Sequence, residues 1–247
     1  MKSLIVIPAR WNSSRFPGKP LTMICGKTLI ERVWEKALGS RKANFSIVAT
    51  DDQRINSFCK KKNIKVVMTS KKCRTGTDRV FEVSKKIHAD IYVNLQGDEP
   101  LINSENIDII INSIKKFKSK NYIASTGYCV SKDLRNKNLA NSFLLKSLNN
   151  RLIYLSRSEI PSNYKKKSAK RLTHIGIMGY TKKGLKIFAN YKSTPLEINE
   201  SNETLRLIEN DDKIYCCLFK NQPKLAVDYP SDVKEIEKYL KNKKRKN

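Results

Sequence analysis

The chain has 247 residues, with 39% hydrophobic and 30% charged side chains. This length can bury a large core, and the composition excludes the charge-dominated, aromatic-poor class of disordered proteins. The formal net charge of +27 suggests a nucleic-acid partner. However, 37 of the 50 basic residues are lysines spread along the chain, without the arginine clusters and aromatic rings of a phosphate-binding surface. We interpret the charge as general composition and keep a basic nucleic-acid-binding module as the alternative class.

The first half of the sequence alternates short β-branched runs with amphipathic segments, which is typical of βα units around a parallel sheet. The predicted strands are nearly continuous apolar runs, as expected when helices cover both faces of the sheet, and they span residues 3 to 8, 45 to 50, 64 to 69 and 90 to 95. The predicted helices span residues 28 to 39, 52 to 62, 77 to 88 and 104 to 118. Ser104 is the expected N-cap of the last one.

The pattern changes after residue 120. Strands are predicted at residues 122 to 130, 142 to 148, 151 to 158 and 213 to 219, and helices at residues 181 to 190, 200 to 209 and 231 to 242. Asn149 and Asn150 form a turn-prone pair between two of these strands. The sequence therefore predicts an α/β protein in one domain, with a mostly parallel sheet and an antiparallel, β-rich excursion.

Several common chemistries are excluded. No Gly-x-Gly-x-x-Gly follows the first strand, and Gly26-Lys27-Thr28 lacks the earlier glycine of a P-loop, since Leu21 stands there. The six cysteines have no metal-ligand spacing and are interpreted as reduced thiols. No apolar run is long enough for a signal peptide or a membrane span, so we expect a cytoplasmic protein.

Three cations lie in the loop that follows the first predicted strand. Arg10, Arg15 and Lys19 stand among small or rigid residues between positions 8 and 21. Open α/β sheets bind ligands at the carboxyl ends of their strands, and spaced cations on a close-approaching backbone suit a triphosphate. A solvated basic loop is the alternative, and charge alone does not separate the two.

Two aspartates each follow an apolar, strand-like run. Asp98 follows the strand at residues 90 to 95, and Asp228 follows a later apolar run just before a proline. Two carboxylates at strand ends can share a Mg²⁺ ion beside phosphates. For Asp228 the alternative is the N-cap of the helix that follows.

Six motifs in order then resemble the 3-deoxy-manno-octulosonate cytidylyltransferase (CMP-KDO synthetase) family. They are I-P-A-R-x-x-S-S-R-x-P-G-K-P-L at the first strand, T-G-T-D-R at 75 to 79, Q-G-D-E-P at 96 to 100, S-R-x-x-I-P at 156 to 161, H-I-G-I-x-G-Y at 174 to 180 and V-D-x-P-x-D at 227 to 232. The match covers nearly the whole chain. A single such motif is weak, but six in sequence are specific.

The resemblance implies one nucleotidyltransferase domain over residues 1 to 247, of the nucleotide-diphospho-sugar transferase type. Its β-rich subdomain at about residues 135 to 180 would help form a homodimer. The implied enzyme joins CTP to a 3-deoxy-ulosonic acid, most often KDO, and releases pyrophosphate, for the synthesis of lipopolysaccharide or another surface glycan. Mg²⁺ is the implied cofactor.

The same resemblance implies roles for individual residues. The catalytic set is Lys19, Asp98 and Asp228, and the two aspartates are also the metal ligands. The nucleotide side comprises Arg10, Ser14, Arg15, Lys19, Thr75, Gly76 and Thr77. The sugar side comprises Gln96, Arg157, His174, Met178, Glu200 and Glu203. Arg157 is suited to a sugar carboxylate and the glutamates to sugar hydroxyls, whereas their alternatives are a surface ion pair and an exposed helix face.

Some positions depart from the family pattern. They are Cys73 in place of His, Asn141 near a usual Lys, Met178 in place of Tyr, Thr204 in place of Gln and Tyr229 in place of Thr. The nucleotide side is otherwise intact, and the departures gather on the sugar side. An amino-KDO or a sialic-acid-like ulosonic acid therefore stays open as the acceptor.

Overall fold

The computed structural model describes residues 1–117, 121–131, 142–162, 164 and 170–244. The principal strands of this part of the chain are β1 (Ser3–Ala9), β4 (Phe45–Thr50), β5 (Val66–Met68), β6 (Ile91–Leu95), β7 (Tyr122–Ser131), β8 (Phe143–Lys146), β9 (Leu152–Ser156), β10 (Arg171–Thr181) and β11 (Lys213–Leu218). They form one sheet in the order β11-β7-β10-β6-β1-β4-β5, and β8 and β9 join it through β10.

The half of the sheet that contains β1 is parallel, as the alternating pattern predicts. β1 pairs in parallel with β4 on one side and with β6 on the other, and β4 pairs in parallel with β5. The chain therefore leaves β1 in one direction across the sheet and returns to its other side at β6. Open α/β sheets bind ligands in the crevice at such a reversal, beyond the carboxyl ends of the strands.

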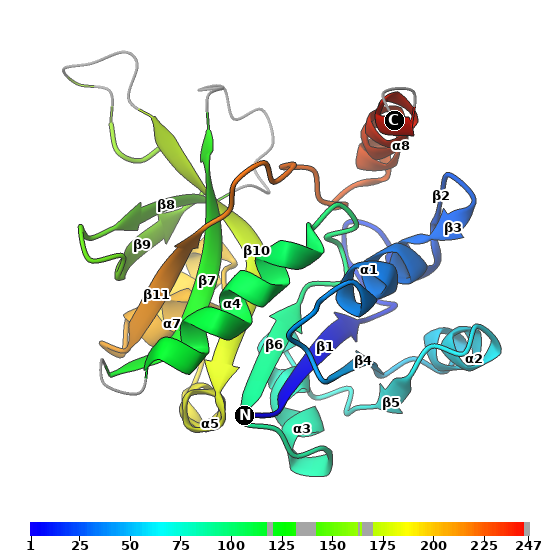
Figure 1. Ribbon diagram of the computed structural model, residues 1–247, viewed down its shortest axis with the longest axis horizontal. Helices are drawn as coiled ribbons and strands as arrows, with labels where there is room; N and C mark the ends of the chain where they lie inside the picture. The colour runs from blue at the N-terminus through cyan, green and yellow to red at the C-terminus, as the bar shows by residue number, and fades with distance from the viewer. Residues whose placement is uncertain (118–120, 132–141, 163, 165–169, 245–247) are drawn as a thin grey trace.

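Helices cover both faces of the sheet (Figure 1). Ile5 and Ile7 of β1 pack into one core with α1 (Leu29–Leu38), α2 (Gln53–Lys61) and α4 (Ser104–Lys116). Leu4 and Val6 point to the opposite core, which contains α3 (Gly76–Lys86) and α5 (Lys182–Asn190). Successive strand residues alternate between the faces, so a strand covered on both sides must be apolar throughout. This confirms the predicted fold class.

The other half of the sheet is mixed. β10 runs antiparallel to β6 and to β7, and β11 runs parallel to β7. β8 and β9 form the expected antiparallel hairpin, with Asn150 in the left-handed region at φ 61°. Much of the subdomain expected at about residues 135 to 180 is seen in β8, β9 and β10, while residues 132–141, 163 and 165–169 lie outside the described part.

One expected helix is in fact two. The segment predicted as a helix at residues 200 to 209 contains the end of α6 (Pro195–Glu200) and all of α7 (Leu205–Ile208). A capping box between Thr194 and Glu197 begins α6, and Ser201 ends it in the left-handed conformation at φ 47°. The resulting bend carries residues 201–204 toward the start of α3, which a continuous helix would not do.

The expected N-cap of α4 is also wrong by one residue. Asn103 holds the cap position, and Ser104 is the first helical residue. The Ser104 hydroxyl instead donates a hydrogen bond to the carbonyl of Lys36, 2.8 Å away, at the end of α1. A tertiary contact has therefore taken the hydroxyl that a local cap would use.

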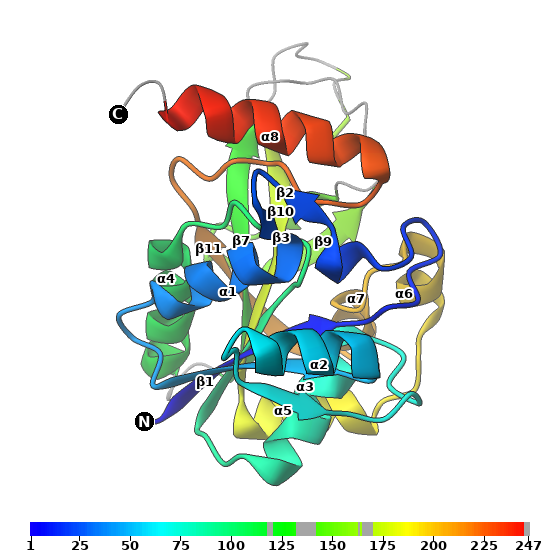
Figure 2. The ribbon, with the colours of Figure 1, turned by 90° about the vertical axis from the view of Figure 1, so that its right-hand side faces the viewer.

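The carboxyl-terminal helix α8 (Pro230–Lys244) crosses one end of the molecule beside the small hairpin of β2 (Met23–Ile24) and β3 (Lys27–Thr28) (Figure 2). Glu237 of α8 accepts a 2.8 Å hydrogen bond from the backbone N–H of Cys25 in that hairpin. α8 thus ties the segment after β11 to the loop after β1. No helix in the described part of the chain has the length and apolar composition that a membrane crossing requires.

Candidate active site

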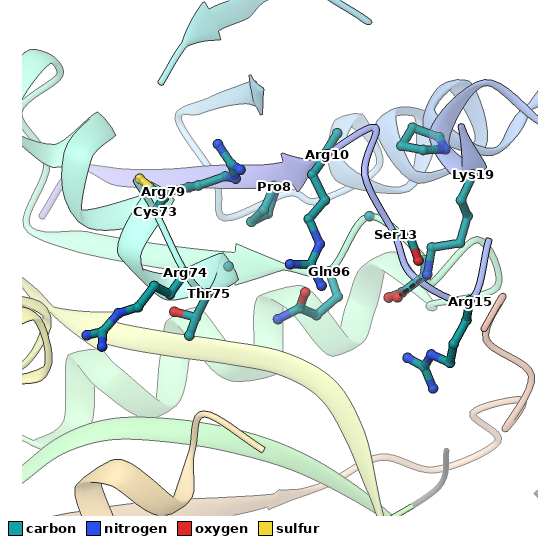
Figure 3. A pocket seen from close by; sticks show the side chains of 15 residues that line it. Pro8, Arg10, Ser13, Arg15, Lys19, Cys73, Arg74, Thr75, Arg79 and Gln96 are labelled. Atoms are coloured by element: carbon teal, nitrogen blue, oxygen red, sulfur yellow. Dashed lines mark hydrogen bonds and ion pairs between the residues drawn. The ribbon is translucent and has the colours of Figure 1, made fainter. Parts of the chain in front are cut away.

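The loop after β1 carries its three cations into the crevice at the sheet reversal. Lys19 opens the short 3₁₀ helix η1 (Lys19–Leu21), and its ammonium lies 2.7 Å from Oδ2 of Asp98. Arg15 lies 2.7 Å from Oδ1 of Asp228. Arg10 makes no ion pair within the described residues and lines the cavity, as does Ser13, whereas Ser14 is exposed. Figure 3 shows Arg10, Ser13 and Lys19 around this cavity.

The outer side of this loop is held by Trp11. Its indole stacks under the guanidinium of Arg54, 3.6 Å from the ring centroid, and Arg54 also pairs with Asp52. On the inner side Gly18 has φ 71°, and a Cβ there would lie 3.1 Å from the indole. Only glycine suits both the left-handed backbone and the close ring. The loop is therefore held in shape before any ligand binds.

Asp98 and Asp228 meet at the crevice although 130 residues separate them in the sequence. Burial raises the pKa of Asp228, and the negative charge of Asp98 adds to this effect while Arg15 and Lys19 oppose it. Asp228 is not the N-cap of α8. α8 begins at Pro230, so Tyr229 holds the cap position, and Asp232 in the first turn accepts 2.8 Å hydrogen bonds at its Oδ2 from the backbone N–H groups of Asp228 and Tyr229. The Asp228 carboxylate is left to face the loop cations.

Glu99 adds a third carboxyl group at this place. Its side chain is buried and accepts a 3.2 Å hydrogen bond from the backbone N–H of Gly176. Burial raises the pKa of Glu99 to about 8, and the neighbouring charge of Asp98 contributes. Glu99 therefore carries a proton readily near neutral pH.

The start of α3 forms the other wall of the cavity. Thr75 and Asp78 form a capping box, and Asp78 also accepts a 3.0 Å hydrogen bond from the backbone N–H of Arg74. The positive end of the helix dipole favours a bound anion. A Cβ at Gly76 would lie 3.2 Å from the side-chain nitrogen of Gln96, so glycine allows the helix to approach β6. Thr77, expected at the nucleotide, is fully buried behind this wall.

The motif analysis gave no role at the site to three residues of the cavity wall, namely Cys73, Arg74 and Arg79. Arg79 is nearly buried and pairs with Asp51 at 2.8 Å. The Cys73 thiol donates a hydrogen bond to Glu82, 3.2 Å away, and burial raises its pKa to about 12. Cys73 is therefore a protonated, unreactive thiol. A cation next to the T-G-T-D-R motif was the available signal for Arg74.

A wider cleft continues from this cavity toward the β-rich half. The two share the residues Arg10, Arg74, Thr75, Gly76, Gln96 and Asp98. Four of the expected sugar-side residues line the cleft, and they are Gln96, Arg157, His174 and Glu203. Ser142, Ser193 and Asn202 line it as well and were not anticipated, because they lie in irregular segments without a motif.

Arg157 and Glu200 connect the end of β9 to the end of α6 through hydrogen bonds in both directions. The Arg157 guanidinium donates to the carbonyls of Glu200, at 2.7 Å, and of Ser201, at 3.3 Å, at the end of α6. The Glu200 carboxylate accepts from the Ser156 hydroxyl and from the backbone N–H of Arg157. Arg157 lines the cleft, whereas Glu200 stands behind it and holds β9 against α6.

His174 presents a defined tautomer to the cleft. The Thr126 hydroxyl donates to the carbonyl of Ile177 at 3.1 Å, so it accepts the 2.7 Å hydrogen bond from Nε2–H of His174. Nδ1 is then left as an acceptor. Burial lowers the pKa of His174 to about 4, which keeps the ring neutral at physiological pH.

Met178 does not line the cleft. It is only 3% exposed and packs in the core behind it, with Leu205, Phe188 and Tyr180 of the same cluster. The Thr204 hydroxyl lies 3.7 Å from its sulfur. Two departures from the family pattern therefore contact each other, and the expectation that Met178 changes the sugar pocket directly is corrected.

The donor set suits a hard divalent cation. Asp98 and Asp228 supply carboxylate oxygens, and Mg²⁺ is usually held by one or two carboxylates together with substrate phosphates and water. The described residues contain no group of three or more His, Cys, Asp or Glu side chains arranged to hold a metal ion. A metal here would therefore take its other ligands from the substrate.

Comparisons with known proteins agree with this geometry. The sequence profile of a family described as Cytidylyltransferase matches residues 4–214. The chain is 38% identical to the 3-deoxy-manno-octulosonate cytidylyltransferase of Chlamydia pneumoniae, over 95% of this chain and 92% of that protein. It is 36% identical to that of Zea mays, over 96% and 80%.

One solved structure gives the same assignment, and a more distant one shows the same fold. A structure of CMP:2-keto-3-deoxy-manno-octonic acid synthetase complexed with CTP is 32% identical and superposes with a TM-score of 0.89, covering 98% of this chain and 100% of that one. The 4-diphosphocytidyl-2C-methyl-D-erythritol synthase of Anaerococcus prevotii shares the fold, with a TM-score of 0.62 at 15% identity. With its motifs, fold and cleft in agreement, the chain belongs to the 3-deoxy-manno-octulosonate cytidylyltransferase family of nucleotidyltransferases.

Proposed function

We propose that this protein transfers CMP from CTP to the anomeric hydroxyl of KDO, with release of pyrophosphate, for the synthesis of lipopolysaccharide. One observation carries the proposal. A cation-lined cavity that contains Asp98 opens directly into a cleft lined by Asp228, Arg157 and His174, so a triphosphate and an acidic sugar can meet at Asp98. The family relatives and the CTP-bound neighbour support the same reaction.

The nucleotide phosphates would lie along the loop after β1 and the start of α3. Arg10 is available to them directly, and Arg15 and Lys19 stand at the same edge. The sugar hydroxyl must attack the α-phosphorus in line with the leaving pyrophosphate. Such a reaction needs positioning and charge neutralisation more than a nucleophile on the protein. The fixed loop and the helix end provide both.

Asp98 and Asp228 would hold the Mg²⁺ ion. A bound Mg²⁺ would offset phosphate charge and lower the pKa of the attacking hydroxyl. Before it binds, the two carboxylates hold Lys19 and Arg15, so the loop cations and the metal ligands are kept next to each other by mutual attraction. Lys19 also donates to the carbonyl of Val227 at 2.7 Å, which fixes the segment that carries Asp228.

We further propose a homodimer formed through the β-rich half. Apolar side chains are exposed there on three strands, with Val130 40%, Ile153 46% and Leu218 41% exposed. A second copy of this surface would cover them. Sedimentation should give twice the chain mass, and a monomer that keeps full activity would contradict this. We place the enzyme in the cytoplasm, where CTP is available and its free thiols stay reduced.

The reaction is tested by measuring pyrophosphate release with each of the four nucleoside triphosphates against a panel of ulosonic acids. The panel includes KDO, an amino-KDO and a sialic acid. We expect release only with CTP, and fastest with KDO. Faster turnover of another ulosonic acid would change the acceptor, and release without any sugar or with any nucleotide would overturn the proposal.

A further inference from the structure

The carboxylate of Glu203 accepts hydrogen bonds from other groups of the protein. Its Oε2 accepts a 3.0 Å hydrogen bond from the backbone N–H of Thr77. Its Oε1 accepts from the Thr77 hydroxyl at 2.9 Å, from Nδ2 of Asn94 at 3.1 Å and from Nε2 of Gln96 at 3.3 Å. Four donors, from α3, from β6 and from Gln96 directly after β6, thus converge on one side chain of the segment between α6 and α7. A direct bond from Glu203 to a sugar hydroxyl would have to compete with all of them.

These hydrogen bonds have a fixed direction. The Thr77 hydroxyl gives its one proton to Glu203, so Tyr180, 3.1 Å away, must donate to Thr77. Burial and the charge of Glu203 raise the pKa of Tyr180, which keeps that proton in place. Asn94 donates to both Thr77 and Glu203, and its buried Oδ1 has no partner within the described residues. The Asn94 amide therefore directs its NH₂ group toward Glu203, although this leaves its own oxygen without a hydrogen bond. The Glu203 carboxylate thus determines how the neighbouring amide is oriented.

The same rule determines the Gln96 amide. A carboxylate accepts and does not donate, so Nε2 of Gln96 must face Glu203 and Oε1 must face away from it. Gln96 lines both the nucleotide cavity and the wider cleft. Gly76 permits this placement, since a Cβ there would lie 3.2 Å from Nε2 and 3.3 Å from Oε1. Oε1 of Gln96 is therefore the hydrogen-bond acceptor that faces this part of the cleft.

We infer that Glu203 is a positioning residue that selects a hydroxyl donor on the sugar, by fixing the Gln96 amide with its oxygen toward the cleft. The inference rests on the proposed function, because it assigns the Gln96 oxygen to the acceptor sugar. A buried site that is built to bond a hydroxyl rejects analogues that lack its proton. Glu203 thus determines sugar specificity through the orientation of the Gln96 amide.

The isosteric change Glu203→Gln tests this. Thr77 N–H still needs an acceptor, so the new amide should place its oxygen there and its NH₂ toward Gln96. The Gln96 amide should then turn and present its NH₂ to the cleft. The measurement is kcat/KM for KDO and for a set of its single deoxyfluoro analogues, at saturating CTP. We expect wild type to disfavour one analogue by about tenfold and Glu203→Gln to reduce that ratio to about one, since one hydrogen bond is at stake.

A second variant shows whether the loss of preference in Glu203→Gln comes from the turned amide or only from damage to the fold. Combining Gln96→Glu with Glu203→Gln exchanges the amide and the carboxylate, so an oxygen again faces the cleft. The double variant should recover the wild-type ratio among analogues that Glu203→Gln alone has lost. Glu209→Gln is the matched control. It removes the carboxylate at the end of α7, which accepts hydrogen bonds from the backbone N–H groups of Leu196 and Glu197, and it should leave the ratio unchanged.

The outcomes separate the two proposals. If wild type releases no pyrophosphate from CTP with any ulosonic acid, the proposed function fails. If wild type is active but Glu203→Gln keeps the full preference among the analogues, the positioning role fails. A change in KM for CTP or in nucleobase preference, with the sugar ratios unaltered, also overturns it, because Gln96 would then serve the nucleotide.

Discussion

At this active site, basic and acidic side chains form close ion pairs with each other. Lys19 and Arg15 hold Asp98 and Asp228 at 2.7 Å, so charges that later act on substrate are neutralised within the protein first. Close ion pairs of this kind lower the cost of gathering two carboxylates in one partly buried place. Glu99 adds little to this electrostatic cost, because burial raises its pKa to about 8 and thereby favours the neutral, protonated form.

Replacing either metal-site aspartate should abolish turnover. Asp98→Asn and Asp228→Asn each remove a charge that stabilises the transition state, and we expect losses of more than ~100-fold in kcat. Calorimetry should also show that Mg²⁺ no longer strengthens CTP binding. Asp90→Asn is the control, because Asp90 lies at the opposite end of β6 and its carboxylate accepts a 2.7 Å hydrogen bond from the backbone N–H of Lys2. Either variant keeping a tenth of the wild-type rate would exclude that residue as a ligand.

His174 should make stability depend on pH. Its pKa is about 4 in the folded protein, below the ordinary value of 6.5. Between these values the unfolded chain binds the extra proton, so stability is complete above pH 6.5 and falls as the pH decreases toward 4. From pH 7 to pH 5 we expect wild type to lose about 2 kcal/mol more than His174→Gln. Urea unfolding at both pH values measures this, and equal losses in the two proteins would show that the ring titrates normally.

At the scale of elements, short helices are joined to one another and to α3 by buried charge. Arg206 of α7 is fully buried and pairs with Glu197 of α6 through two bonds of 2.9 and 2.5 Å. It also lies 3.4 Å from Asp78, the capping residue of α3, and stacks 4.1 Å from the centroid of Phe188. Helices of six and four residues have little stability alone, so this pairing holds them in place.

Breaking this pair should be costly, whereas removing it entirely should cost less. Arg206→Met leaves the Glu197 carboxylate buried and unpaired, and we expect a loss of about 3–5 kcal/mol in the free energy of unfolding. Adding Glu197→Leu should recover part of that loss, because no buried charge is then left over. Lys62→Ala, which removes a partly exposed pair with Glu31, should cost less than about 1 kcal/mol. If the double variant were less stable than Arg206→Met, the desolvation argument would be wrong.

At the scale of the whole molecule, the charge of +27 is spread widely, while Asp98, Glu99 and Asp228 lie together where the chemistry is proposed. Lysines on many exposed segments create a long-range positive field that attracts CTP and other polyanions alike. Selectivity must therefore come from the cleft. The stacked Trp11 and the α3 start shape that cleft before substrate arrives.

Nucleic-acid binding should accordingly be weak and governed by salt. We expect a short DNA duplex to bind at low ionic strength and to be released at about 0.15 M salt, because the contacts are screened phosphate contacts without base readout. Fluorescence anisotropy across a salt series measures this. Truncation after Leu240, which removes a lysine-rich end, should leave pyrophosphate release unchanged. Sequence-selective binding that survives 0.15 M salt would favour the alternative class.

Local patterns in the sequence were sufficient for the parallel half of the fold and for the positions of the main site residues. Apolar runs such as residues 3 to 8 and 45 to 50 identify strands covered on both faces, because burial on two sides leaves no polar alternation. The loop cations and Asp98 follow from the same rule, since strand ends in parallel units converge at one edge. The six motifs then identified the family.

Contacts between distant segments decided the rest. β10 inserts antiparallel between β6 and β7, and its motif residues do not say which neighbours it will pair with. Glu203 meets Thr77, Asn94 and Gln96 across more than 100 residues, and Met178 packs against Thr204 behind the cleft. A local pattern reports whether a residue is polar and how it repeats. It does not report which partner uses the side chain, because that depends on how separate elements pack.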